Sequence, residues 1–231
     1  MKALTKILAP AGLALATLAV TAPATAQVQG NVATANVTNA ILGTTALQTA
    51  YQQVNTTYAA QITTRQTKQQ ELSTLLQPFD TNGNGQLDDA EVPAVQSSPN
   101  FTQISTLEAE IAAINQQVNN ARIFAVEQIL RQYPTALQEI ATAQQIQIVF
   151  QPDAIQYAGT GVDITPQIVT SLNAKVPSVQ IVPPANYRPS RQGAQIFQEI
   201  QQTLIAAQIR QQQAAAQQQP AQGNTQAPQG R

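Results

Sequence analysis

The residues best suited to chemistry in this chain form one stretch, from Asp80 to Glu91. Oxygen-bearing side chains recur in it at alternate positions. A calcium-binding loop takes its ligands from loop positions 1, 3, 5, 7, 9 and 12, and it needs a glycine at position 6 for a sharp turn. The candidate ligands, in that order, are Asp80, Asn82, Asn84, Gln86 through its backbone carbonyl, Asp88 and Glu91. Gly85 stands at position 6 and Leu87, the usual apolar residue, at position 8, so the spacing predicts a calcium site.

We expect this loop to hold one calcium ion per chain, and to hold it weakly. The loop has no partner loop, and two of its ligand positions carry Asn in place of Asp, which favours a Kd of about 10⁻⁴–10⁻³ M. Pro78 and Pro93 limit the helices on either side, because proline removes a helical N–H. The alternative is a solvated turn, which is also rich in Asp, Asn and Gly. Such a turn gives no reason for Leu87 and Glu91 to stand at the loop positions where a calcium-binding loop needs an apolar residue and a carboxylate.

The composition excludes most catalytic chemistry. The 231 residues include no Cys and no His, which removes thiol nucleophiles, disulfides and the most common general base. The remaining carboxylates are scattered; Glu108 and Glu110, for example, are two positions apart and so do not share a helix face. We therefore expect that the chain is not an enzyme. The net charge of -1 also lacks the excess of positive charge that is typical of nucleic-acid-binding proteins.

Residues 1–26 predict a signal peptide. Two lysines form a positive start, an apolar stretch follows over 7–20, and Ala24-Thr25-Ala26 forms an A-x-A cleavage site. The apolar stretch is short and rich in small residues for a membrane span. We expect export and cleavage after Ala26, without stable membrane insertion; an uncleaved anchor is the alternative.

Two long amphipathic segments flank the calcium-type loop and predict a helical hairpin over 41–145. Apolar residues recur every three or four positions through 41–77 and again through 101–145. Two such helices joined by a short connection pack antiparallel, with the loop 80–91 at the tip. Each apolar stripe is narrow, which favours a coiled-coil seam over the wider faces of a bundle core. Pro134 predicts a kink in the second helix.

Shorter elements outside the hairpin predict a small body from residues 27–40 and 146–184. Alternating apolar residues predict strands over 28–37, 146–150, 153–157 and 179–182. Thr165 as N-cap and Pro166 at the first helical position open a helix that Pro177 ends. The predicted fold class is α+β, mostly α. A body this small buries little apolar surface alone, so we expect it to assemble with further copies of the chain.

The last part of the chain, 185–231, predicts a linker, an Ala/Gln-rich helix and a tail. Apolar residues on a helical period predict a short amphipathic helix within 192–219, which docks on the body or on a partner. From residue 211 to 231 the sequence is low-complexity Gln, Ala, Pro and Gly, which predicts disorder. The tail is either solubilising or a partner-binding peptide.

One segment of the predicted body carries a longer pattern. It reads Val162-Asp163-Ile164-Thr165-Pro166-Gln167-Ile168-Val169-Thr170-Ser171-Leu172-Asn173. This segment, the order of elements before it and the entry from Ala35 to Leu42 resemble the OmpH/Skp-like periplasmic chaperones of outer-membrane proteins, whose pattern is V-D-I-T-x-x-(I/V)-x-x-x-L-N. The resemblance implies a homotrimer in the periplasm, in which three short β segments per chain form a central body. Its helical arms would surround a cavity that holds unfolded outer-membrane proteins without ATP.

Two features depart from that family. Its known members commonly have strongly basic arms, whereas few charges lie between Gln52 and Gln77 here, so electrostatic capture of a client or of lipopolysaccharide is not implied. A calcium-type loop at the hairpin tip is also outside the family pattern. We expect calcium there to neutralise the loop carboxylates, which are Asp80, Asp88, Asp89 and Glu91, and to fix the angle between the arms. The alternative function is a calcium-binding structural or adhesion protein of the cell envelope, in which the arms are spacers.

Overall fold

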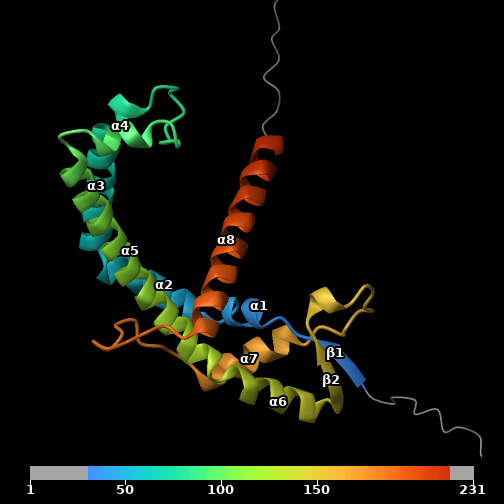
Figure 1. The fold of residues 1–231 in the computed structure, drawn as a ribbon. Helices are drawn as coiled ribbons and strands as arrows, with labels where there is room; N and C mark the ends of the chain where they lie inside the picture. Colours follow the sequence, from blue (N-terminus) through green and yellow to red (C-terminus); the bar gives the residue numbers. More distant parts are fainter. Residues whose placement is uncertain (1–30, 219–231) are drawn as a thin grey trace, which may run out of the picture.

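The computed structural model describes residues 31–218. Helices make up most of these residues, and a small two-stranded sheet lies at one end of the molecule (Figure 1). A curved arm of paired helices and a single C-terminal helix extend from the body beside the sheet (Figure 1). The predicted fold class, α+β and mostly α with a long helical hairpin, is therefore confirmed. The predicted signal peptide, the start of the first strand and the end of the tail lie outside the described residues.

The sheet joins two segments that are far apart in the sequence. Strand β1 (Asn31–Thr34) pairs in parallel with strand β2 (Ile146–Phe150), so the strand predicted over 146–150 is confirmed. Val32 and Ile148 are partners on the outer face of the sheet and are 42 % and 37 % exposed. The next pair along the strands turns toward the core. Each strand therefore has one face covered by the body and one face turned outward.

Two further predicted strands, over 153–157 and 179–182, are not strands. The first follows Pro152, which lacks an N–H for strand pairing, and the chain forms the 3-10 turn η2 (Pro152–Ala154) instead. The second lies across helix α5 (Phe101–Leu130), where the backbone of Gln180 exchanges two hydrogen bonds with the Gln128 side chain (2.8 and 3.0 Å). These predictions were wrong because apolar alternation does not show whether a segment finds a backbone partner.

The body contains three helices beside the sheet, and α7 (Thr165–Lys175) packs against both α1 (Val37–Leu42) and α6 (Tyr133–Ala143). Its fully buried large side chains include Ile41, Ile129, Ile164, Ile168 and Leu172. Helix α7 begins one residue earlier than predicted, with Ile164 at the N-cap. The Thr165 hydroxyl accepts a hydrogen bond from the Asn36 N–H (3.0 Å) instead of capping its own helix. This bond ties the start of α7 to the start of α1.

The arm is formed by α2 (Thr45–Thr57) and α3 (Ala59–Leu76), which run antiparallel to α5. The continuous helix predicted over 41–77 is thus interrupted twice, at Gly43–Thr44 and at Tyr58. Helix α3 has no buried residue, whereas the facing stretch of α5 buries several apolar side chains. The seam of the outer arm is therefore narrow, as the thin apolar stripes predicted.

Proline positions set the ends of several helices. Helix α5 ends at Leu130 and α6 begins at Tyr133, so the kink predicted at Pro134 is a complete break. Pro134 lies in the first turn of α6, where its missing N–H removes no intrahelical bond. At the tip of the arm, the loop 80–91 is flanked by two short elements, η1 (Gln77–Phe79) and α4 (Val92–Gln96), each with a proline in its first turn.

The C-terminal segment crosses α5 at the base of the arm before it forms a helix of its own, α8 (Arg191–Gln218) (Figure 1). The first half of α8 packs on α5 and α1 through Ile196 and Ile200. Its second half extends away from the body (Figure 1). The disorder predicted from residue 211 is wrong as far as Gln218, because Ala and Gln are good helix formers.

Candidate functional site

The six predicted calcium ligands lie in one loop at the tip of the arm, and this loop has the turns that their spacing requires. Gly83 and Gly85 have φ values of 69° and 76°, in the left-handed region that favours glycine. The two carboxylate oxygens of Asp80 accept hydrogen bonds from the backbone N–H groups of Asn84 (3.1 Å) and Gly85 (2.7 Å). The first half of the loop therefore folds over the Asp80 carboxylate.

The other polar side chains of the loop continue this network. Asn82 Oδ1 accepts from the Asn84 N–H (2.9 Å), and Asn84 Oδ1 accepts from the Gln86 N–H (2.7 Å). The Asp88 carboxylate accepts from the Asn82 side chain (2.9 Å) and from the Ala90 N–H (3.0 Å). Contacts between positions 3 and 9 thus join the two halves of the loop.

Glu91 closes the loop. Its Oε1 accepts from the N–H and the hydroxyl of Thr81 (2.6 and 2.7 Å), and its Oε2 accepts from the Asp88 N–H (3.2 Å). The residue is 4 % exposed, and its hydrogen-bond partners all belong to the same loop. The hydrogen bond from the Thr81 hydroxyl, helped by backbone N–H groups, holds the pKa of Glu91 below its usual value. Glu91 is therefore an ionised carboxylate at neutral pH.

The oxygen atoms of the loop are of the chemical types that bind a hard cation. Within residues 31–218, no three Asp, Glu, His or Cys side chains gather as a metal site of their own. A cation in the loop would therefore also need the amide oxygens of Asn82 and Asn84 and the carbonyl of Gln86. Carboxylate, amide and carbonyl oxygens are the ligands of calcium, whereas zinc is usually held by Cys and His. A bound cation would compete with Thr81 for the oxygens of Glu91.

A hollow of about 520 Å³ lies between the loop and the end of α3. Leu72 and Leu76 of α3 line it together with Leu87, Asp80 and Gly85 of the loop. Leu87 is half-buried there, so the apolar residue at position 8 turns back toward the preceding helix, as its position predicts. Leucines of the loop and of the arm thus face the same hollow.

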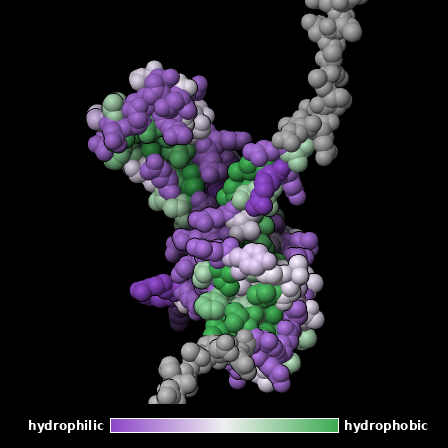
Figure 2. All heavy atoms as spheres, turned by 90° about the vertical axis from the view of Figure 1, so that its right-hand side faces the viewer, coloured by the Kyte–Doolittle hydropathy of each residue, from purple (hydrophilic) through white to green (hydrophobic). Residues whose placement is uncertain are grey.

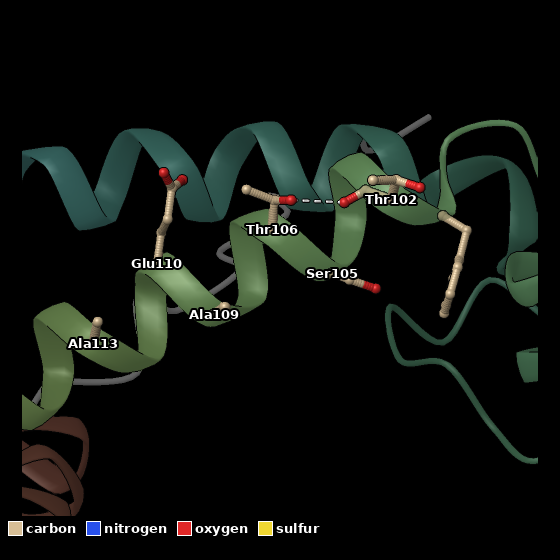
Figure 3. A pocket seen from close by; sticks show the side chains of 7 residues that line it. Thr102, Ser105, Thr106, Ala109, Glu110 and Ala113 are labelled. Carbon is tan, nitrogen blue, oxygen red and sulfur yellow. Dashed lines mark hydrogen bonds between the residues drawn. The ribbon is translucent and has the colours of Figure 1, made fainter.

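The outer part of α5 carries a shallow, mostly apolar groove (Figure 3). Its volume is about 590 Å³, and it is lined by Phe101, Thr102, Ser105, Thr106, Ala109, Glu110 and Ala113. Phe101 is 42 % exposed, and the small side chains that follow it leave the groove open. Glu110 forms an ion pair with Lys68 of α3 (2.7 Å). This surface can accept apolar groups, but it brings no acid and base together for catalysis.

A second apolar surface lies on the outer face of the sheet. Phe150 is 41 % exposed there, beside the exposed pair Val32 and Ile148, and Tyr157 on the following loop is 88 % exposed. Figure 2, which looks onto this side of the molecule, shows hydrophobic side chains gathered at the sheet end of the body. The signal for this surface in the sequence is the run Ile148-Val149-Phe150, which is apolar on both faces of the strand.

A polar anchor on α5 could not be seen in the sequence. Glu127 accepts hydrogen bonds from the Tyr187 hydroxyl (2.9 Å) and from the Ser190 N–H (2.7 Å), whose residues are 60 and 63 positions away. Burial, and then the hydrogen bond and charge of Glu127, raise the pKa of Tyr187 well above its usual value. The anchor fixes the segment before α8 onto the arm.

A family model described as Outer membrane protein (OmpH-like) matches residues 31–172. Among solved structures, a candidate outer membrane chaperone (OmpH-like) from Caulobacter crescentus matches with a TM-score of 0.41 and 18 % identity, over 66 % of this chain and 89 % of that chain. The comparison with curated proteins finds no match. None of the helices within residues 31–218 combines the length and the apolar character needed to cross a bilayer.

Proposed function

Because the chain belongs to the OmpH-like outer membrane protein family, a family of periplasmic chaperones rather than enzymes, we propose that it is a holdase that works without ATP. It binds unfolded outer-membrane proteins between helical arms and keeps them from aggregating in the periplasm. The observation that carries this proposal is the extent of the family match: residues 31–172 contain both the sheet and the complete arm.

The surface of the arm suits weak binding of an extended chain at many points. Amide, hydroxyl and small apolar side chains dominate α3 and the outer half of α5. The groove in Figure 3 is shallow and open, so it can accept an apolar side chain without selecting one shape. Many contacts of this kind hold a client without fixing it in a single conformation.

We propose that three copies assemble through their sheets. A two-stranded sheet is marginally stable alone, and the outer face of this one exposes Val32, Ile148 and Phe150. Contiguous exposed apolar side chains mark an interaction surface, and around a threefold axis three copies can cover this face together. The three arms of such a trimer would enclose the space that holds the client.

Suppression of aggregation tests the holdase function. An outer-membrane β-barrel protein, unfolded in urea, is diluted into buffer with the chain that lacks residues 1–26, and light scattering is followed. We expect an equimolar amount of trimer to lower the scattering strongly, with or without ATP. A folded protein of similar size that is not a chaperone serves as the control. Scattering equal to that of the client alone would exclude the holdase function.

The second candidate function is a calcium-dependent structural or adhesion role at the cell envelope, and the loop at the far end of the arm favours it. In either function we propose that the loop holds one calcium ion per chain, weakly. The proposed ligands are Asp80, Asn82, Asn84, Gln86, Asp88 and Glu91. The ion would neutralise the carboxylates at the tip and stiffen the arm there, with little effect on the rest of the fold.

Calorimetry with calcium tests the loop. We expect about one site per chain with a Kd of about 10⁻⁴–10⁻³ M, which Asp80→Ala and Glu91→Ala abolish. Asp89→Ala removes the same charge from a loop position that supplies no ligand, so it should keep the site. If millimolar calcium gives no heat, the loop is a hydrogen-bonded turn and does not bind calcium. If calcium binds but the chain leaves client aggregation unchanged, the structural role is favoured over the chaperone.

A further inference from the structure

Two arginines on the arm have no acidic partner within residues 31–218. Arg65 of α3 and Arg122 of α5 are both half-buried, and neither takes part in the two ion pairs found within residues 31–218. Each makes one hydrogen bond to an asparagine on the opposite helix, Arg65 to Asn115 (3.2 Å) and Arg122 to Asn55 (3.1 Å). A guanidinium has five N–H donors. Most donors of both side chains are therefore left without a partner in this part of the chain.

The surroundings of these arginines disfavour an uncompensated charge. The Nε atoms of Arg65 and Arg122 are shielded from water and have no hydrogen-bond partner, and neither do the Tyr51 hydroxyl and Gln61 Oε1. The Arg122 guanidinium lies over the Tyr51 ring, 5.8 Å from its centroid. Burial lowers the pKa of Arg122; Tyr51 opposes this in part, and the like charge of Arg65 adds to it. A negative group from outside these residues would offset the repulsion between the two arginines.

The two arginines follow each other along the arm. The contacts Arg122–Asn55 and Arg65–Asn115 are successive cross-links between antiparallel helices, about 10 to 15 Å apart at 1.5 Å per residue. The intervening residues, 56–64 and 116–121, include no charged side chain. Gln201 of α8 lies close to Tyr51, so the Arg122 end is at the corner where α8 leaves the arm. Helix α8 lies beyond the residues that match the family.

We propose that Arg65 and Arg122 bind carboxylate groups of the unfolded polypeptide that the arm holds. This inference rests on the proposed chaperone function. It adds a contact that distinguishes negatively charged side chains of the client from neutral ones. The planar fork of an arginine binds a carboxylate through two parallel N–H···O bonds. A lipid with several phosphate groups is the less favoured ligand, because the site has only two cations and the chain has a net charge of -1.

The test compares two synthetic peptides that differ only in charge. Both are fluorescein-labelled and alternate apolar and polar residues; one carries two aspartates, and the other carries asparagines in their place. We expect the full chain to bind the aspartate peptide about three- to tenfold more tightly, which corresponds to a contact of about 1 kcal/mol. High salt should reduce this preference. The variant R65Q/R122Q should bind both peptides equally, and as tightly as wild type binds the asparagine peptide.

Matched variants separate this proposal from general electrostatics. Arg131→Gln removes one positive charge from an exposed position at the end of α5, so it should keep the full preference. Arg122→Lys keeps the charge without the fork, so it should lose part of the preference, and it provides a second variant if R65Q/R122Q unfolds. Circular dichroism checks the fold of each variant.

Three results would overturn the proposal. The first is a preference for the aspartate peptide that persists in R65Q/R122Q. The second is equal binding of both peptides by wild-type chain that still suppresses client aggregation, which leaves the chaperone function intact. The third is displacement of the aspartate peptide by inorganic phosphate at concentrations at which acetate has no effect, which assigns the site to phosphate groups. If wild type neither binds a peptide nor suppresses aggregation, the chaperone function fails as well.

Discussion

Among single residues, Tyr51 couples the stability of the molecule to pH. Its hydroxyl is buried without a hydrogen-bond partner, and burial raises its pKa from 10.0 to about 12. Below pH 10 the side chain is neutral in both the folded and the unfolded chain. Between pH 10 and 12 the unfolded chain ionises first, so the free energy of unfolding falls as pH rises. We expect a loss of at most about 2–3 kcal/mol from this residue.

The variant Tyr51→Phe should remove this loss. It should cost little at neutral pH, because the hydroxyl meets no group with hydrogen-bond geometry within residues 31–218, although the Gln201 side chain lies near it. Urea unfolding on either side of the window, near pH 8 and near pH 12, measures the effect. Tyr157→Phe is the control, since that ring is 88 % exposed. Tyr187, whose pKa is also raised, leaves part of the pH dependence in both variants. If the free energy of unfolding falls with pH equally in wild type and in Tyr51→Phe, the prediction is wrong.

Position 193 has no room for a side chain, and only the folded structure shows this. A Cβ atom at this position would come within 2.5 Å of the Glu127 carboxyl group, which anchors Tyr187 and Ser190. We expect Gly193→Ala to lower stability by about 1–2 kcal/mol, although alanine favours a helix over glycine by about 1 kcal/mol.

A double-mutant cycle by thermal unfolding checks the Gly193 prediction. In a Glu127→Ala background the steric conflict is gone, so Gly193→Ala should become neutral or stabilising. Gly159→Ala is the control, because a Cβ there would meet nothing within 4 Å. If Gly193→Ala is equally harmful in both backgrounds, the contact with Glu127 is not the cause.

At the scale of elements, Thr44 separates two helices and caps one of them. It is fully buried; its hydroxyl donates to the Ile41 carbonyl (2.7 Å) and accepts from the Leu47 N–H (3.3 Å). We expect Thr44→Val, which keeps the shape but loses the hydroxyl, to cost about 1–2 kcal/mol. Thr44→Ser keeps the hydroxyl and should cost less. The midpoint of urea unfolding decides between them, and a Thr44→Val variant as stable as wild type would show that the cap is dispensable.

Sequence periodicity predicts the elements whose causes are local. Helix α5 and strand β2 follow their apolar patterns, and the turn at Gly85 follows from its place in the calcium-type spacing. The interruption at Gly43–Thr44 combines the local cap of Thr44 with a contact that the sequence does not show, in which the Thr45 N–H bonds to the Asn173 side chain (3.0 Å). Arg65 and Arg122 are single polar residues in amide-rich segments, so only the packing of α3 on α5 shows that they lack an acidic partner.

At the scale of the whole molecule, the outer face of the sheet decides the proposed assembly. Ile148→Asp would place one carboxylate per chain in the proposed interface, where like charges repel. We expect the mass from light scattering to fall from that of three chains to that of one, with helix content unchanged, because the side chain is 37 % exposed in the single chain. Gln147→Asp adds the same charge at an exposed polar position of the same strand, so it should leave the assembly intact. Wild-type chain with the mass of a single copy would exclude the trimer.

The parallel pairing of β1 with β2 leads us to expect a particular order of folding. Asn31 and Gln144 are joined by a hydrogen bond although they are 113 residues apart, and contacts of such separation form slowly from an open chain. The arm forms from nearer contacts, and once α5 has folded back along α2 and α3, the two strands are brought close together. For export from the N-terminus, as residues 1–26 predict, we expect β1 to stay unpaired until the whole arm has emerged and turned back, and the body to fold last.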